Sequence, residues 1–121
     1  MNIYTSCFSR AKLLDPARYC VVSISRFPPM WFNGPKCLSL APSCDLLKAY
    51  HDGLSWSSYV SRYQSEVLAD VDVRSVLASV AKECHGRDMV LCCWESSPVH
   101  CHRSLVAGLV QALYGYSMKD I

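Results

Sequence analysis

The sequence predicts an α/β fold, a small three-layer sandwich around a mainly parallel sheet. Three observations support this prediction. Strand-like apolar segments alternate with helix-like amphipathic segments. The last strand-like segment, residues 88–94, is almost entirely apolar, as expected of a strand covered on both faces. That segment leads through a short loop into a final helix, the connection that parallel sheets use. A length of 121 residues indicates one domain, spanning residues 1–121.

The first half of the chain contains two of the three predicted strands. Residues 3–8 form a short strand, and residues 19–25, which are rich in Val and Ile, form a stronger one. Residues 9–18 have room for only a short helix or a loop. Prolines and a glycine exclude regular structure over most of residues 26–35, although an edge strand is not ruled out there.

The second half contains most of the predicted helices. A short helix covers residues 44–50. Ser55 is a plausible N-cap of the next helix, and Asp72 caps a third that ends near Gly86. Residues 88–94 form the third strand, residues 95–99 a loop, and residues 100–113 the last helix. The apolar residues expected to face inward on these helices are Tyr59, Val60, Tyr63, Val67, Val73, Val76, Leu77, Val80, Leu105, Val106, Leu109, Val110 and Leu113.

The composition excludes several classes of protein. Hydrophobic residues make up 51% and charged residues 18% of the chain, so a disordered chain is excluded. A net charge of +2 is too small for wrapping a nucleic-acid duplex, and no apolar run approaches the roughly 20 residues of a membrane span. No signal-peptide pattern is visible at the N-terminus, so we expect a soluble, cytoplasmic protein. The fold is Rossmann-like only in the broad sense, because the glycine-rich dinucleotide motif is missing, as are the Walker loop and the Cys-x-x-x-x-x-Arg phosphatase motif.

Most of the eight cysteines are expected to be small buried hydrophobic residues rather than parts of a disulfide framework, because nothing in the sequence indicates secretion. Cys93 and Cys101 differ from the others in position, since they stand at the end of a strand and at the start of a helix. The cysteines predicted to be small buried hydrophobic residues are Cys7, Cys20, Cys37, Cys44 and Cys92.

Polar side chains follow all three predicted strands, in residues 5–7, 23–26 and 93–103. Because the carboxyl ends of parallel strands meet at one edge of a sheet, these side chains are expected to line one cleft. The residues predicted to bind a ligand there are Thr5, Ser6, Ser25, Arg26, Trp31, Cys93 and Arg103.

The start of the last helix has the residues suited to chemistry. Unpaired amides there favour an anion, and Arg103 adds a guanidinium fork for phosphate or carboxylate. The same position lowers a thiol pKa, which makes Cys101 a candidate nucleophile with His100 or His102 as its base. Glu95 is a candidate general acid or base. Glu95, Cys101 and His102 are therefore the predicted catalytic residues. The alternative, that these groups cap the helix over a packed thiol, stays open.

The aromatic loop and the closely spaced Cys and His residues each have two possible interpretations. The aromatic loop with Phe27, Trp31 and Phe32 either stacks a nucleobase or covers the sheet edge. The close spacing of Cys and His does not match a zinc knuckle, so no metal and no cofactor is predicted, but a zinc site assembled through space stays open. The residues considered for it are Cys84, His85, Cys93, His100, Cys101 and His102.

The chain resembles the domain-of-unknown-function family number 488, in its short single-domain branch. The resemblance spans nearly the whole chain and depends on short motifs. These are Tyr4-Thr5-Ser6, Ser23-Ile24-Ser25, Pro29, Trp31 to Pro35, Leu40-Ala41-Pro42, Tyr59, Tyr63, Val67-Leu68, Leu91, Cys93-Trp94-Glu95 and Cys101-His102-Arg103. The chain departs from the family pattern at Cys92 and His100. The resemblance implies an α/β fold and a polar cluster of Ser6, Ser25, Glu95, Cys101, His102 and Arg103, and it assigns no reaction.

These observations predict an anion-binding cleft for a phosphate-bearing small molecule, a nucleotide or nucleoside derivative, with its modification left open. Two alternatives remain. One is a non-catalytic binding protein, of phage or mobile-element origin, that sequesters a nucleotide or blocks a partner protein. The other is a zinc-stabilised nucleic-acid-binding module.

Overall fold

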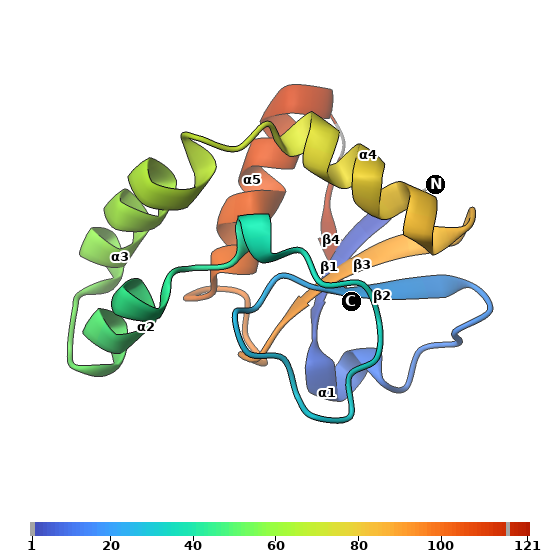
Figure 1. Ribbon diagram of the computed structural model, residues 1–121, viewed down its shortest axis with the longest axis horizontal. Coiled ribbons are helices and arrows are strands. Elements are labelled where there is room, and N and C mark those ends of the chain that lie inside the picture. Colours follow the sequence, from blue (N-terminus) through green and yellow to red (C-terminus); the bar gives the residue numbers. More distant parts are fainter. Residues whose placement is uncertain (1, 116) are drawn as a thin grey trace.

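Four parallel strands form one sheet in the order β2-β3-β1-β4 in the computed structural model, which describes residues 2–115 and 117–121 (Figure 1). The strands are β1 (Ile3–Cys7), β2 (Tyr19–Ser23), β3 (Asp88–Cys93) and β4 (Lys119–Asp120). Every pairing is parallel, with β3 between β2 and β1, and β4 at the edge beside β1. The predicted α/β fold with a parallel sheet is therefore confirmed.

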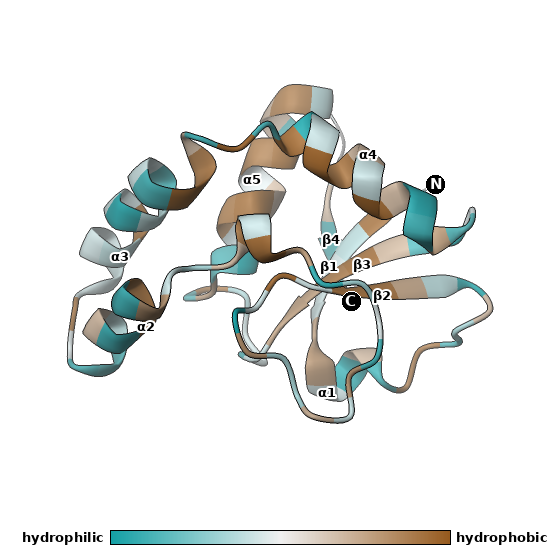
Figure 2. Cartoon of the chain, in the orientation of Figure 1, coloured by the Kyte–Doolittle hydropathy of each residue, from teal (hydrophilic) through white to brown (hydrophobic). Residues whose placement is uncertain are grey.

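Helices cover both faces of this sheet. The short helix α1 (Phe8–Ala11) lies on one face, and α4 (Val73–Cys84) and α5 (His102–Tyr114) lie on the other (Figure 1). The mostly hydrophobic α5 contacts β1 and β3 (Figure 2). The helices α2 (Cys44–His51) and α3 (Trp56–Tyr63) extend beyond the sheet, flanked by a 3-10 turn at Leu38–Leu40 and a π-helical turn at Gln64–Leu68. None of the described helices is long and apolar enough to cross a membrane.

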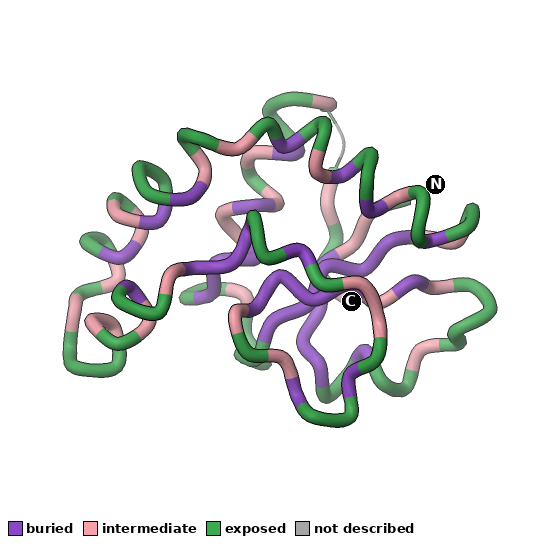
Figure 3. The backbone as a smooth tube through the Cα atoms, viewed as in Figure 1, coloured by how far each residue is buried: buried purple, intermediate pink, exposed green. Residues whose placement is uncertain are grey.

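The central strand β3 is buried on both faces, as its apolar sequence predicts. Met89, Leu91 and Cys93 face the large core under α4 and α5, whereas Val90 and Cys92 face a smaller core under α1. Because neighbouring residues of a strand point to opposite faces, one apolar run serves both cores. Figure 3 shows the buried residues gathered on β1, β2 and β3, and many exposed ones on α2 and α3.

Side-chain caps start three of the helices where the sequence predicts. Ser43 accepts a hydrogen bond of 3.1 Å from an amide in the first turn of α2. Ser55 accepts one of 3.2 Å from the first turn of α3, and Asp72 accepts one of 3.3 Å from the first turn of α4. Each cap satisfies an amide that the helix itself leaves unpaired. At the other end of α4, His85 adopts a left-handed conformation with φ of 52°, and Gly86 follows.

The structure corrects four local predictions. The edge strand beside β1 is β4, and residues 26–35 form no strand. Just after this segment, Lys36 forms only an isolated bridge with Ser23. The second strand ends at Ser23 rather than residue 25, and the last helix begins at His102 rather than residue 100. Cys44 is exposed, because it lies in the first turn of α2 on the solvent side. The other four cysteines predicted to be buried are buried.

Tyr63 anchors α3 to the rest of the core. Its side chain is fully buried, and its hydroxyl donates a hydrogen bond of 2.6 Å to the Leu40 carbonyl. Tyr59 is also buried, so the prediction that both tyrosines belong to the core is confirmed. Burial raises the pKa of Tyr63, so the hydroxyl stays protonated and remains a donor.

We expect Tyr63→Phe to lower the free energy of unfolding by about 1–2 kcal/mol, because the Leu40 carbonyl loses its buried donor. Urea unfolding followed by far-ultraviolet circular dichroism measures the change. Tyr19→Phe is the matched control, since Tyr19 is partly exposed and its variant should unfold like the parent. Equal losses in the two variants would contradict this account.

Candidate functional site

The three polar segments predicted to converge do meet at the carboxyl edge of the sheet. In the register of the strands, Ser6 and Ser23 both lie beside Cys92. The segment after β2 is tied to the start of α5, because a ring nitrogen of His102 lies 2.7 Å from the Ile24 carbonyl oxygen. The convergence forms two separate environments, an interior polar network and an open cavity.

Arg103 is the centre of the interior network. Its side chain is 0% exposed. Nε and Nη2 donate to the two carboxylate oxygens of Asp120 over 2.8 and 3.2 Å, and Nη2 also donates to the Ser96 carbonyl over 3.1 Å. Nη1 donates to the Glu95 carbonyl and lies 3.1 Å from Cys93 Sγ. All of its nitrogens are therefore directed at protein acceptors. The anion-binding role of Arg103 stays a prediction, and it would require a ligand to displace Asp120.

The strand β4 and the residue after it occupy the place next to β1. Thr5 donates a hydrogen bond to Asp120 over 2.7 Å, and Ser6 donates to the Ile121 carbonyl over 2.6 Å. Arg10 binds the same carbonyl and the Asp120 carboxylate. Two predicted ligand-binding hydroxyls, those of Thr5 and Ser6, are thus engaged inside the protein.

The open environment is a cavity of about 440 Å³, called the aromatic cavity below, between α2, α3 and the carboxyl edge of the sheet. It contains five of the predicted site residues, namely Ser25, Arg26, Glu95, Cys101 and His102. Its other lining residues are Phe27, Pro42, Leu47, Tyr50, His51, Trp56, Tyr59, Trp94 and His100.

Stacked rings form one wall of the aromatic cavity. Trp56 stacks on Tyr59 with ring centroids 5.2 Å apart, and its ring also lies against His100 at 5.0 Å. Trp94, another lining residue, is half-exposed and donates its indole N–H to the Phe27 carbonyl over 2.7 Å. Two indole rings therefore line this cavity.

Trp31 does not cover this cavity, which corrects the expected position of the aromatic loop. Trp31 lines a different cavity, of about 820 Å³, together with Phe32, and its ring packs edge-on against Phe8 at 6.2 Å. Phe32 is buried in the small core under α1. Trp31 and Phe32 therefore pack on the face of the sheet that α1 covers, whereas the second interpretation placed the loop over the edge of the sheet. Only Phe27 of the three aromatic residues reaches the aromatic cavity.

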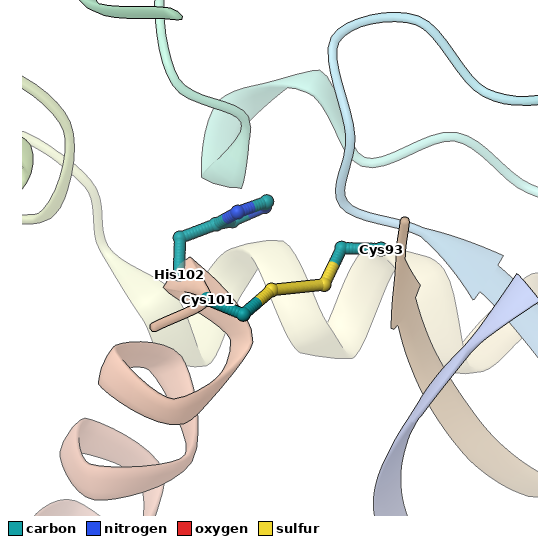
Figure 4. A group of neighbouring side chains, drawn as sticks. All are labelled: Cys93, Cys101 and His102. Atoms are coloured by element: carbon teal, nitrogen blue, oxygen red, sulfur yellow. A yellow bond between two sulfur atoms is a disulfide. The ribbon is translucent and has the colours of Figure 1, made fainter. Parts of the chain in front are cut away.

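Cys93, Cys101 and His102 form what we call the sulfur cluster, where β3 ends and α5 begins. Cys93 and Cys101 are joined as a disulfide, and the His102 ring lies beside them (Figure 4). The Glu95 carboxylate lies 3.9 Å from the Cys101 sulfur. The disulfide ties up both thiols in this state, so the nucleophilic role of Cys101 stays a prediction that needs the reduced protein.

The environment of His102 holds its imidazole neutral. Burial, helped by the charge of Arg103, lowers the pKa of His102 to about 4, although the hydrogen bond to Ile24 acts in the opposite direction. A carbonyl oxygen can only accept, so Nε2 carries the proton and Nδ1 has the lone pair. A base with so low a pKa removes protons poorly at neutral pH, so the catalytic role of His102 stays a prediction.

Sequence reasoning missed Trp56 and Asp120, and it assigned no role to Trp94 although that residue belongs to the segment 93–103 expected at the cleft. Trp56 is the first residue of α3, next to the recognised cap Ser55, but no local pattern shows that α3 faces the sheet edge. Trp94 directly follows a recognised strand, and its position after that strand was the available signal. Asp120 binds a residue 17 positions earlier and gives no signal in the sequence.

The pairing of Asp120 with Arg103 predicts acid-sensitive stability. Partial burial alone would raise the pKa of Asp120, but hydrogen bonds from Arg103 and Thr5 and the nearby positive charges outweigh it and lower the pKa. A carboxyl with a lowered pKa in the folded state stabilises the fold above its ordinary pKa of about 3.9, and the contribution is lost as the pH falls below it.

We therefore expect Asp120→Asn to lower the free energy of unfolding at pH 7 by on the order of 2 kcal/mol, since it leaves Arg103 without its counter-charge. The loss should begin to shrink as the pH falls below about 4, where the unfolded chain takes up a proton at this carboxyl, and it should disappear once the folded carboxyl, whose pKa is lower, is protonated as well. Urea unfolding across this range measures it, with the exposed Asp52→Asn as control. A loss that is independent of pH would exclude this role for the carboxylate.

Comparison with known proteins adds a family. The model described as the active DUF488-N3 subclade (DUF488-N3a) matches residues 31–113, which include Glu95, Cys101, His102 and Arg103. No curated protein and no solved structure matches the chain significantly. The match covers well over half of the chain and agrees with the motifs around Cys93 and Arg103. The chain belongs to the DUF488-N3a subclade of the uncharacterised family DUF488.

Proposed function

We propose that the protein binds a nucleotide or nucleoside derivative in the aromatic cavity and modifies it. The observation that carries this proposal is the composition of the cavity wall. Two indole rings, a cationic side chain and a carboxylate line one space of about 440 Å³. A flat heterocycle, an anionic group and a reacting bond each have a suitable partner there.

The indole rings suit a nucleobase. Trp56 and Trp94 line the cavity from different elements, and Trp56 is held by its stacking on Tyr59 and His100. Aromatic side chains stack on any base, and each stacked base contributes about 1–3 kcal/mol. A ring fixed by its neighbours loses little conformational entropy when a ligand binds.

Arg26 is the residue that we assign to the anionic group. Its Nε donates to the Pro42 carbonyl over 3.1 Å, which holds the side chain at the cavity. Within the described part of the chain, its two terminal nitrogens have no acceptor. Arg103, in contrast, is saturated by Asp120 and two carbonyls. Arg26 therefore replaces Arg103 in this proposal as the group that contacts phosphate or carboxylate.

Glu95 is the group that we assign to proton transfer. It is exposed at the cavity, directly after the buried strand β3. Arg103 binds its main-chain carbonyl and so positions the residue without using its carboxylate. The subclade to which the chain belongs is described as active, which supports a chemical role for the protein. If bound nucleotide is always recovered unchanged, the protein sequesters its ligand instead.

Binding is tested with the ribonucleosides and their 5′-monophosphates as probes, by isothermal titration calorimetry and quenching of tryptophan fluorescence. We expect Trp56→Ala to weaken binding about 10-fold or more, in line with the loss of one stacking contact. Trp31→Ala is the matched control and should leave affinity unchanged, because Trp31 lines the other cavity. No binding of any probe, or equal losses in both variants, would refute the proposal.

The assignment of the anion is tested separately. We expect Arg26→Ala to reduce affinity for the monophosphates about 10-fold while leaving affinity for the nucleosides unchanged, since only the former need the cation. Arg18→Ala is the control, because Arg18 lies over Tyr19 and does not line the cavity. An equal loss for nucleosides and monophosphates would show that Arg26 acts through packing alone.

A further inference from the structure

The sulfur cluster brings together three metal-ligating side chains in a buried place. The two sulfur atoms and one ring nitrogen of His102 all lie within 4.8 Å of one another. The three residues come from the end of β3, the N-cap of α5 and its first residue, and their exposed fractions are 0%, 3% and 7% (Figure 4). Among the described residues, Cys84, His85 and His100 do not belong to this group.

The hydrogen bond of His102 determines which of its ring nitrogens has the lone pair. Nε2–H donates to the Ile24 carbonyl over 2.7 Å, so the lone pair is on Nδ1. Histidines that bind metals almost always donate their other ring N–H to a carbonyl or carboxylate, which fixes the tautomer and the ring orientation. This contact orients the ring whether or not a ligand is present.

The sulfur atoms also contact a hydrogen-bond donor of the kind that surrounds metal-bound thiolates. Nη1 of Arg103 lies 3.1 Å from Cys93 Sγ and 3.6 Å from Cys101 Sγ. N–H donors and a nearby cation stabilise the deprotonated thiolates that bind metals. Asp120 pairs with Arg103, which reduces the repulsion between the guanidinium and a metal ion at the sulfurs.

The backbone spacing of the two cysteines suits an intervening ion. Their Cα atoms are 7.6 Å apart, beyond the about 4.4–6.8 Å over which disulfides usually form. A metal ion between two sulfurs spans a wider separation than a direct sulfur–sulfur bond does, because each metal–sulfur bond is itself about 2.3 Å long.

We propose that the reduced protein binds one zinc ion through Cys93 Sγ, Cys101 Sγ and His102 Nδ1. Two thiolates and a neutral imidazole balance the charge of Zn²⁺, so the buried cluster has no net charge. Two of the three proposed ligands, Cys101 and His102, line the aromatic cavity together with Glu95, so a fourth ligand would reach the ion from that side. Three protein ligands and an open position are typical of catalytic rather than structural zinc sites. Water bound there would lie on the side of Glu95, as hydrolytic chemistry requires.

The disulfide and the zinc site are alternative states of the same atoms. A dithiol or phosphine reductant supplies two electrons, which with two protons convert the disulfide to two thiols, and the reductant is oxidised. Binding of Zn²⁺ then replaces those two protons, which pass to the buffer. The disulfide form has no thiolate to offer and does not bind the ion.

The test uses the full chain, reduced with a phosphine, freed of reductant without oxygen and titrated with Co²⁺ and then Zn²⁺. We expect one Co²⁺ per chain, with the sulfur-to-cobalt charge-transfer band and the visible bands of a tetrahedral site, and displacement of the Co²⁺ by Zn²⁺. The oxidised protein should bind neither ion. If the reduced chain binds no Co²⁺ or Zn²⁺, or binds Co²⁺ without a thiolate band, the proposal is wrong, and this readout needs no variant to fold.

Variants then identify the ligands. We expect Cys101→Ser and His102→Gln to weaken Co²⁺ binding by more than the about 10–100-fold that loss of an outer hydrogen-bond partner causes. The matched controls are Cys44→Ser, which is exposed, and Cys92→Ser, which faces the opposite side of β3. Both should bind Co²⁺ like the parent. Loss of the thiolate band in either control, or its retention in Cys101→Ser, would overturn the assignment.

The proposal of a metal site and the proposal of a nucleotide site can be refuted separately. Co²⁺ binding is read without any nucleotide, and Trp56→Ala should bind Co²⁺ like the parent. Nucleotide binding without Co²⁺ binding would leave the proposed function intact and refute the zinc site, whereas the reverse result would refute only the nucleotide proposal.

Discussion

The buried guanidinium of Arg103 is the constraint on which the site depends. A charge that has no contact with water is tolerated only where every donor has an acceptor and a counter-charge is near. The acceptors are the carbonyls of Glu95 and Ser96 and the carboxylate of Asp120. One side chain of α5 therefore holds the loop after β3 and the edge strand β4 against the sheet, and the positions of the residues around it follow from that.

In this arrangement, the residues that support the site differ from the residues that a ligand would contact. The interior network uses Arg103, Thr5 and Ser6, which are buried and paired with the segment around β4. The aromatic cavity instead presents partly or fully exposed groups, including Arg26 and Glu95. A rigid, fully satisfied network next to a cavity of less constrained side chains is a suitable arrangement for binding, because the supporting residues hold the contacting ones in place. The nucleotide proposal places its ligand on the cavity side of this boundary. The proposed zinc ligands lie at the boundary itself, because Arg103 contacts both sulfurs while Cys101 and His102 line the cavity.

Much of the fold was predictable because it depends on local patterns. The apolar run of β3 predicts burial on both faces, and the caps Ser55 and Asp72 mark helix starts that the structure confirms. The strand β4 was not predictable, since two residues with charged side chains carry no strand pattern. They pair with β1 because the Asp120 carboxylate binds Arg103 and Thr5.

The sequence by itself determined the fold class, the order of the elements and the edge of the sheet at which polar residues gather. These follow from periodicity and from the rule that parallel strands end together. Only the tertiary structure decided which of those residues face a ligand. In the structure, Arg103 pairs with Asp120, Trp31 lines another cavity and Trp56 lines the candidate site. The physical reason is that burial and pairing depend on residues distant in the sequence, and local patterns do not encode those contacts.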